Sequence, residues 1–500
     1  MKQYLYIAAL SLAAMTSYAQ QDANTPSDAV RLAQDNLTGT ARFRAMSGAF
    51  GAVGGDLSAL NVNPAGSAIF NFNSGTGSLT SYNVNNSSNY FGTKTRENES
   101  SFDLNQLGFV FVFNNTKEDA TWKKFSLAFN YENTNNFDNN LFSAGINPSG
   151  SIDQYFLRYA NGIGSEGGIE LNTLNNAYFE DLSYIDQQAY LGYNAFVFNP
   201  VTQDATNTAY TTNVPAGGNN YQENATVTTG YNGKVTVNLA GQLMDRFYLG
   251  ANINVHFTDY LKNSSYYEEF NNAGVNDLQW VQFDNQRYTY GGGFSFNLGA
   301  IAKVTDALRV GIAYESPTWY TLQDEVTQSI SANVGGDFIN TNPGVTIIMD
   351  DYSIKTPAKI TGSLAYVFGR NGLISIDYAR KDYSTTEFSG NNYNTLNEQL
   401  EGTLTTADEI RVGLEYRIKN VSLRGGYRYE GSPYKNELTI GELTGFSGGI
   451  GFSFNSSRLD LAYSYYNREM NVPVLTEGLS TPARINSDNN NVTLSYTIDL

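Results

Sequence analysis

Apolar and polar residues alternate in segment after segment of this chain, up to its last residue. In the final segment, Val492, Leu494, Tyr496, Ile498 and Leu500 lie on one face, with Thr, Ser and Asp between them. The same period of two runs through residues 247–258, 308–314 and 410–418. A soluble β-sandwich also alternates. It rarely places aromatic and branched residues on one face of a dozen strands and Gly, Ser, Asn and Thr on the other, so the pattern favours a transmembrane barrel.

The composition excludes several classes of protein. Cysteine is absent, which excludes disulfides and thiolate metal sites. The net charge of −18 argues against nucleic-acid binding, because a phosphate-binding surface needs clustered Lys and Arg. Charged residues make up 16%, whereas the chain has 36 Tyr, 29 Phe and 47 Gly, as expected of a membrane barrel with aromatic girdles. We expect no metal and no cofactor.

The first 19 residues read as a secretory signal peptide. Lys2 is followed by an apolar run from Leu5 to Ala14, and Ser17-Tyr18-Ala19 offers a cleavage site. The run is too short to span a bilayer as a helix, which takes about 20 residues. We therefore expect export and exclude this segment from the fold.

The connections between alternating runs give the number of strands. Outer-membrane barrels have short periplasmic turns and longer outer loops. Six short turns are expected near 115–122, 243–246, 304–307, 369–372, 419–420 and 455–457. Seven polar loops are expected near 87–104, 133–222, 261–286, 317–354, 385–407, 431–444 and 468–488. These 13 connections join 14 strands, so residues 73–500 are predicted to form a 14-stranded antiparallel barrel with a long outer loop at about 133–222.

A barrel of 14 strands needs a plug, because about eight strands already enclose a lumen that side chains just fill. Residues 20–72 precede the first strand and are not strand-like, so we predict an N-terminal hatch inside the lumen. Its Gly-rich run could instead be a linker, although its apolar content is high for disorder; it lacks the Lys-Ser/Thr of a phosphate loop. Six hatch residues could line an apolar ligand pocket: Phe43, Met46, Phe50, Val53, Leu57 and Leu60.

The hatch also carries a family resemblance. Residues 48–66 read GAFGAVGGDLSALNVNPAG, which resembles the plug of the FadL/TodX outer-membrane transporters. Further segments resemble the strands of that family in the same order: 309–317 (RVGIAYESP), 356–366 (TPAKITGSLAY), 409–416 (EIRVGLEY), 423–433 (LRGGYRYEGSP) and 459–465 (LDLAYSY).

The resemblance implies both a fold and a function. It implies a 14-stranded barrel with an N-terminal hatch in the outer membrane of a Gram-negative bacterium. It also implies inward transport of hydrophobic molecules, such as long-chain fatty acids or aromatic hydrocarbons, without enzymatic activity. Asn63, Pro64, Ala65 and Gly66 match the family's hatch element. The loop at 133–222 is longer than the family's, and no pocket residues are carried over.

Charges on the inward faces of the strands allow two interpretations. The two-residue turn Lys419-Asn420 should place Glu415 opposite Arg424 and Arg411 opposite Arg428. The pairs could form a structural ladder bracing barrel and plug. Alternatively, an arginine could hold a fatty-acid carboxylate in its planar fork. The candidates for that role are Arg309, Arg411, Arg424 and Arg428.

Two other features of the sequence say less about function. His256 is the only histidine and lies on an inward face, so a Ser-His-Asp site would have to use it; haem transport could use only Tyr or Met beside it. The long loop has two helix-like apolar patches, which could pack together or form a collecting groove. They comprise Ile152, Tyr155, Phe156 and Tyr159, then Leu182, Ile185, Ala189, Tyr190 and Tyr193.

Two classes of function remain open. The chain could be a porin-like channel for a hydrophobic small molecule, or a surface barrel that partners a protein secretion system. In either case we expect contact with outer-membrane lipids and a monomer.

Overall fold

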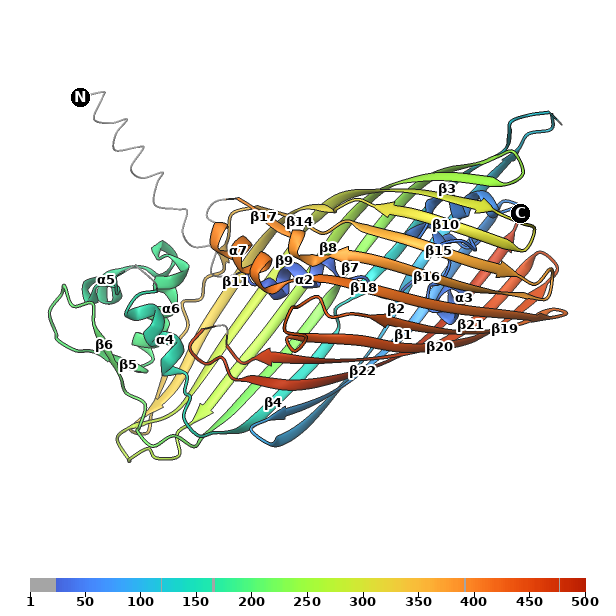
Figure 1. The fold of residues 1–500 in the computed structure, drawn as a ribbon. Helices are drawn as coiled ribbons and strands as arrows, with labels where there is room; N and C mark the ends of the chain where they lie inside the picture. The colour runs from blue at the N-terminus through green and yellow to red at the C-terminus, as the bar shows by residue number, and fades with distance from the viewer. Residues whose placement is uncertain (1–23, 118, 164–166, 391–392, 476) are drawn as a thin grey trace, which may run out of the picture.

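Antiparallel strands close on themselves into a barrel (Figure 1). The structure is a computed structural model that describes all residues except 1–23, 118, 164–166, 391–392 and 476. The expected signal peptide lies outside the described residues. The first strand, β1 (Ser74–Tyr90), pairs along its length with the last, β22 (Pro482–Asp499), which closes the wall into a ring. Within the described residues, no helix has the length and apolar character needed to cross a membrane.

The wall contains 14 strands, which confirms the predicted count. Eleven are continuous: β1, β2 (Thr93–Asn114), β7 (Asn220–Leu243), β8 (Phe247–Glu269), β9 (Leu278–Lys303), β16 (Gly372–Asp382), β18 (Thr406–Ile418), β19 (Val421–Glu430), β20 (Ile440–Phe454), β21 (Ser457–Pro473) and β22. Three are interrupted: β3 (Trp122–Asn136) with β4 (Asn139–Asn147), β10 (Leu308–Glu315) with β11 (Trp319–Val334), and β14 (Tyr352–Lys355) with β15 (Lys359–Val367). Short strands β12 (Asp337–Thr341), β13 (Ile347–Ile348) and β17 (Glu387–Ser389) extend the wall.

All six short turns lie where the alternation predicted them, whereas most of the outer loops are shorter than predicted. β1 and β2 are joined by residues 91–92 alone, and β8 and β9 by residues 270–277. The long loop runs from 148 to 219 instead of 133 to 222, because β4 occupies 139–147 and β7 begins at Asn220. For the loop after β1 the prediction was wrong because the outward residues of β1 from Ser81 to Asn89 are polar, although backbone pairing with β2 continues to Tyr90.

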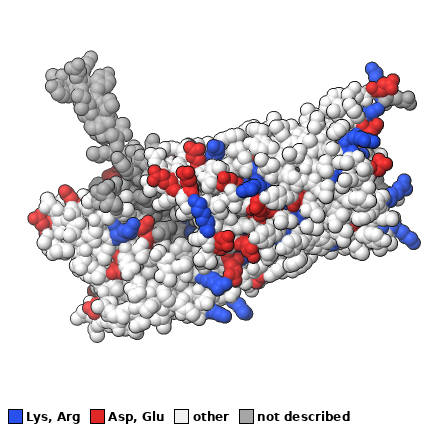
Figure 2. Space-filling view, viewed as in Figure 1, with Lys and Arg blue, Asp and Glu red and all other residues white. Residues whose placement is uncertain are grey.

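The outside of the barrel is apolar around its middle. Outward side chains of neighbouring strands are exposed large hydrophobic residues, among them Phe109, Phe111, Leu239, Ile253 and Leu494. Figure 2 shows a stretch of uncharged wall between Lys and Arg at the end of the short turns and a mixed group of acidic and basic side chains nearer the loop end. An exposed apolar belt of this extent is the surface that a barrel presents to lipid.

Residues 24–73 lie inside the barrel and contain no strand. Four short helices make up this hatch: α2 (Pro26–Ala33), α3 (Ala41–Ala45), and the 3₁₀ helices η1 (Leu57–Asn61) and η2 (Pro64–Ile69). Thr40, Asp56 and Asn63 cap the N-termini of the last three with their side chains, because each accepts a backbone N–H of the first turn. The hatch is thus a series of short, capped helical turns. Such turns can fill the lumen of the barrel more closely than long helices would.

Paired glycines on neighbouring strands let the hatch backbone touch the wall. Gly250 and Gly299 are direct partners on β8 and β9, and a Cβ on Gly299 would collide with Asn63 and lie 2.7 Å from Cδ of Pro64. A second pair, Gly413 and Gly426 on β18 and β19, contacts the backbone around Met46 in the same way. These close approaches fix where the hatch docks.

The wall has a seam where backbone pairing is missing. β2 pairs with β3 only from Gln106 to Asn114, and β4 pairs with β7 alone among the described strands. Side chains bridge the seam: Asn133 donates to Asp103, and Asn136 donates to Ser101 at 3.2 Å. The barrel would lose the fewest backbone hydrogen bonds if it opened sideways here.

Loop helices cover the outer end of the barrel (Figure 1). The long loop contains α4 (Asp153–Ala160), α5 (Leu171–Asn176), η3 (Phe179–Asp181) and α6 (Tyr184–Asn194), with β5 (Phe198–Pro200) paired to β6 (Tyr210–Thr212). Tyr155 and Phe156 of α4 pack against Phe283 on the inner face of β9. Beside them, η4 (Tyr383–Thr385) and α7 (Asn394–Thr403) pack over α2. The two predicted apolar patches therefore pack on each other and on the wall.

We predict that Gly299→Leu displaces the hatch. The new side chain would overlap Asn63 and Pro64, and overpacking of this kind costs about 1–3 kcal/mol. Single-channel conductance in planar bilayers should rise, and trypsin should cleave at Arg42 or Arg44. The matched control is Gly362→Leu on β15, where a Cβ meets nothing within 4 Å. Equal conductance of the two variants would contradict the docking role of Gly299.

Candidate functional site

The six hatch residues predicted to line an apolar pocket are all buried. Their exposed fractions are at most 4%. Phe43 and Phe50 pack with ring centroids 5.3 Å apart, and Met46 and Val53 join the same cluster. Leu57 and Leu60 pack instead against Val110 and Ala128 of the wall. In this closed state the six side chains are packed against protein, so a ligand among them would need the hatch to move.

The Asn63-Pro64-Ala65-Gly66 element forms a docked bend. Asn63 accepts the amide N–H of Ala65 and donates to the carbonyls of Gly51, at 2.8 Å, and Ala300, at 3.1 Å. From the wall, Asn238 donates to the carbonyl of Pro64 at 2.9 Å. One asparagine side chain thus ties together the bend, the Gly-rich run and the wall.

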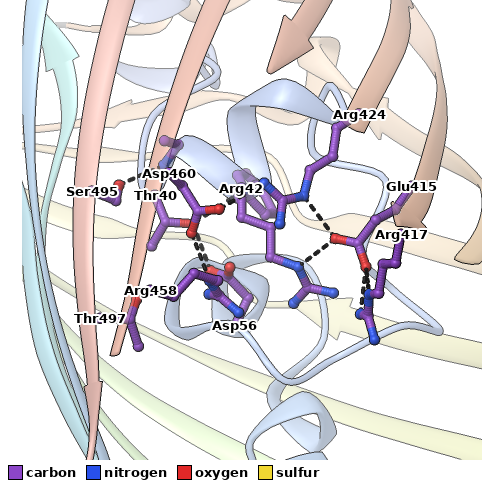
Figure 3. Close-up of polar contacts among 12 residues, drawn as sticks. Thr40, Arg42, Asp56, Glu415, Arg417, Arg424, Arg458, Asp460, Ser495 and Thr497 are labelled. Atoms are coloured by element: carbon purple, nitrogen blue, oxygen red, sulfur yellow. Dashed lines mark hydrogen bonds and ion pairs between the residues drawn. The ribbon is translucent and has the colours of Figure 1, made fainter. Parts of the chain in front are cut away.

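Arg42 connects the hatch to a row of buried charges on the wall (Figure 3). Its Nε donates to Glu415 at 2.9 Å, and Arg424 donates to the same carboxylate at 2.7 Å. Arg424 also donates to Asp460, at 2.7 Å, which in turn accepts from Arg458 at 2.6 Å. Glu415 and Arg424 face each other in register and are buried, which confirms the prediction from the two-residue turn.

A second ion cluster holds Asp35 of the hatch. Lys359 and Lys381 lie 2.6 and 3.1 Å from its carboxylate, on β15 and β16. Arg428 donates to the backbone carbonyl of Asp35 at 2.7 Å. Burial alone would raise the pKa of Asp35, but the two lysines outweigh it and hold the pKa well below its usual range.

A third ion pair holds α2 near the outer end. Asp28 lies 3.2 Å from Arg287 of β9, which also pairs with Asp324 of β11 at 2.6 Å. Burial opposes ionisation of Asp28, yet Arg287 and Arg31 outweigh it and lower the pKa of Asp28. Ion pairs therefore hold the hatch at three levels of the lumen.

The four arginines proposed for carboxylate binding lie around the hatch. Three already pair with carboxylates of the protein: Arg411 with Glu409, Arg424 as above, and Arg428 with Glu409 and Glu430. Arg309 differs, since it donates to the carbonyl of Val53 at 3.1 Å and is in no ion pair of the described residues. Of the four, Arg309 is the one whose positive charge is not already matched by a neighbouring carboxylate.

His256 lies in the lumen wall, as its parity predicted. Its Nε2 is 2.7 Å from the hydroxyl of Ser295, and its ring packs edge-on against Tyr320. The described residues contain no cluster of three or more metal-ligating side chains. The contacts of His256 are those of a wall residue.

The sequence did not predict which hatch residues make these contacts with the wall. Asp28, Asp35 and Arg42 carry the ion pairs, while Glu132 and Asp377 of the wall accept hydrogen bonds from Thr38 and Gly51. The alternation places Glu132 and Asp377 on the inward faces of their strands. Because a charge on an inward face needs a partner, the sequence could have predicted that both carboxylates contact the hatch. The hatch charges have no periodic pattern that could have revealed them.

The fold is similar to those of three solved structures. A Pseudomonas aeruginosa FadL homologue is 12% identical, with 93% of this chain and 99% of that chain covered and a TM-score of 0.53. The Pseudomonas putida toluene transporter TodX is 15% identical, with 94% and 100% covered and a TM-score of 0.51. The monoaromatic hydrocarbon channel CymD is 13% identical, with 93% and 99% covered and a TM-score of 0.50.

The likeness defines the class of fold. No protein-family model matches the chain by sequence, and no curated protein does either. At these identities the structural likeness establishes the fold, a 14-stranded transmembrane β-barrel with an N-terminal hatch. More particularly, the chain has the FadL/TodX fold along nearly its whole length.

We predict that acid loosens the hatch. Asp28 and Asp35 have pKa values lowered from 3.8, so their ion pairs stabilise the fold above about pH 4. That contribution is lost as the pH falls through the lowered values. Bilayer conductance should therefore rise below about pH 4. Asp35→Asn should conduct already at pH 7, unlike Asp245→Asn in a short turn. Acid-insensitive conductance would contradict the prediction.

We also predict that Arg424→Met destabilises the barrel more than Arg458→Met does. Arg424 has a 1% exposed side chain between two buried carboxylates, whereas the side chain of Arg458 is 28% exposed. Removing a buried partner costs about 3–5 kcal/mol, and removing a partly exposed one about 1 kcal/mol or less. Urea unfolding followed by gel mobility of unheated samples measures the difference. Equal losses would show that Arg424 is not a central tie.

Proposed function

We propose that this chain is an outer-membrane channel for the uptake of small hydrophobic molecules. The observation that carries the proposal is a lumen filled by a separate, docked hatch within a fold shared with hydrocarbon channels. A barrel meant only as a wall or anchor needs no removable filler. An apolar ligand needs no catalytic group, since it gains roughly 25 cal/mol per Å² of surface buried.

Apolar clusters mark a path from the outer mouth to the hatch. The first cluster lies under the long loop and includes Tyr155, Phe156 and Phe283. The second surrounds α2 and includes Tyr320 and Tyr352, and the third is the hatch cluster with Phe43 and Phe50. A hydrophobic molecule could move between these clusters by exchanging contacts with one set of aromatic side chains for contacts with the next.

Two classes of cargo fit the proposal. A single-ring hydrocarbon would need only the aromatic surfaces. A long-chain fatty acid would also need a partner for its carboxylate, and Arg309 supports that role best because its charge is not matched by a neighbouring carboxylate. Arg309→Ala should then reduce uptake of oleate but not of toluene.

The test locks the hatch to the wall. Ser47 and Ser447 lie with their hydroxyls 2.7 Å apart, one on the hatch and one on β20, and the chain has no cysteine of its own. In the Ser47→Cys/Ser447→Cys variant, oxidation should stop toluene uptake by cells, and reduction should restore it. Uptake should also exceed that of cells carrying the empty vector.

The matched control places the disulfide between two neighbouring strands of the wall. Thr80 and Thr493, on β1 and β22, have hydroxyls 2.9 Å apart. The Thr80→Cys/Thr493→Cys variant should carry toluene equally well when oxidised or reduced. Uptake that persists through the locked hatch would contradict passage by hatch movement, and no uptake above the vector would contradict the channel proposal.

The alternative, a surface barrel that partners a secretion system, rests on the long outer loop. Its helices bury most of their apolar residues, but Tyr178 and Phe196 are exposed, at 72% and 48%. A large protein that co-purifies with the chain and is lost on deletion of residues 167–213 would favour this alternative.

A further inference from the structure

The helices of the long outer loop lie together at the outer end of the barrel (Figure 1). We call α4, α5, η3, α6, β5 and β6 the loop unit. Gly192 of α6 lies so close to α4 that a Cβ on it would be 2.6 Å from the ring of Phe156. The same Cβ would be 2.8 Å from the ring of Phe198 of β5. Because its parts are packed this closely, we expect the loop unit to move as one body.

The loop unit bridges two sides of the barrel mouth. Its buried apolar residues belong to one cluster with inward side chains of the wall. On one side these are Tyr266, Val281, Phe283, Ile330 and Ala332, from β8, β9 and β11. On the other side they are Tyr90 of β1 and Ala483 and Ile485 of β22. In the wall, β2, β3 and β7 lie between these two groups of strands, so the loop unit crosses the mouth.

Buried hydrogen bonds hold the stem of the loop unit to β7 and β8. The stem consists of Gly150, Ile152 and Asn220, where the loop leaves and rejoins the wall. The N–H of Ile152 donates to Glu268 at 2.8 Å, and Gln222 donates to the carbonyl of Gly150 at 2.9 Å. Glu268 is fully buried and also accepts from Gln222 and Asn220. Breaking hydrogen bonds to a buried acidic group is costly, so we expect the stem to stay in place.

A second buried contact lies on the same side of the mouth. Gln188 of α6 and Gln328 of β11 donate to each other at 2.8 and 3.2 Å, and both side chains are buried. β11 is joined to β8 through β9 alone, so this contact and the stem lie close together along the wall. Together they hold one side of the loop unit.

The contact with the loop between β21 and β22 is weaker. Its polar part is the ion pair between Arg158 of α4 and Glu477, with Nε and Oε2 2.5 Å apart. These side chains are 49% and 39% exposed, and exposed ion pairs add little to stability. Beside them, a Cβ on Gly478 would lie 2.5 Å from the carbonyl group of Gln154, so the two backbones touch. This side therefore meets the loop unit through apolar contacts, a backbone contact and a solvent-exposed ion pair.

We propose that the loop unit is a lid that pivots on β7, β8 and β11 and lifts first from β21 and β22. Lifting would open a way into the lumen between α4 and β22. The inference rests on the proposed uptake function only for what enters, a hydrophobic ligand whose first contacts would be Ala483 and Ile485. Movement of the lid can be measured without transport.

The test measures lid movement by the reactivity of buried thiols. The chain has no cysteine of its own, so Ile485→Cys and Val281→Cys each carry one thiol. Ile485 lies on the lifting side, whereas Val281 is the register partner of Glu268 on the pivot side, and both are at most 1% exposed. In full-length protein purified in detergent without a histidine tag, a maleimide should label Ile485→Cys at least about tenfold faster than Val281→Cys.

A reversible metal tie shows whether the lid controls this reactivity. In the Arg158→His/Glu477→His variant the two imidazoles can share one Ni²⁺ ion, because the side chains they replace already meet. Combined with Ile485→Cys, Ni²⁺ should slow labelling by about tenfold, and a chelator should restore it. The matched control is Lys355→His/Glu387→His, whose exposed parent side chains lie 3.7 Å apart on neighbouring strands of the wall. There Ni²⁺ should leave the rate at Ile485→Cys unchanged.

The outcomes separate the lid from the proposed function. Equal labelling of the two thiols, or labelling of Ile485→Cys that Ni²⁺ does not slow in the tied variant, would overturn the lid. If Ni²⁺ slows both the labelling and the uptake of toluene by cells carrying the tied variant, the lid admits the ligand as proposed. If Ni²⁺ slows labelling but not uptake, entry through the lid is wrong. Uptake no higher than with the empty vector would overturn the proposed function while the labelling result still decides whether the lid moves.

Discussion

A closed wall of 14 strands encloses more space than its own side chains can fill, and the rest of this structure answers that constraint. The pleat directs every second side chain inward, so the lumen receives Ser, Thr, Asn and charged groups while the lipid face receives aromatic and branched ones. A polar lumen alone would be a water channel. The hatch turns it into a packed interior by bringing its own apolar cluster and its own charges.

The hatch and the wall recognise each other by two different means. Paired glycines allow the backbone of the hatch to touch the backbone of the wall, at Gly250 with Gly299 and at Gly413 with Gly426. Buried ion pairs then fix the orientation of the hatch, since Arg42 pairs with Glu415 while Asp35 pairs with Lys359. Buried ion pairs add little net stability but are costly to break. This combination suits a filler that must stay in one position and still be able to leave it.

Much of the wall could be predicted from the sequence, because alternation, turns and cross-strand register are local. The two-residue turn at Lys419-Asn420 placed Glu415 opposite Arg424, and the six short turns are correct. Strand ends beyond the membrane were wrong, since outward residues such as those of β1 from Ser81 to Asn89 become polar while pairing continues. The partners of the lumen arginines could not be predicted, because Asp28, Asp35 and Arg42 reach the wall through a fold without periodicity. Which hatch residues face open space depends on that same packing.

Uptake by hatch movement therefore requires a hatch that is docked as one body in the absence of ligand. The most direct measurement places one spin label at Ser27, exposed on α2, and another at Lys419, exposed in a short turn. Pulsed electron–electron dipolar spectroscopy then gives the distribution of distances between hatch and wall. We predict one narrow distribution without ligand and a second, shifted population when a transported hydrophobic compound is added. A broad distribution without ligand would contradict it, because the hatch would then not be docked.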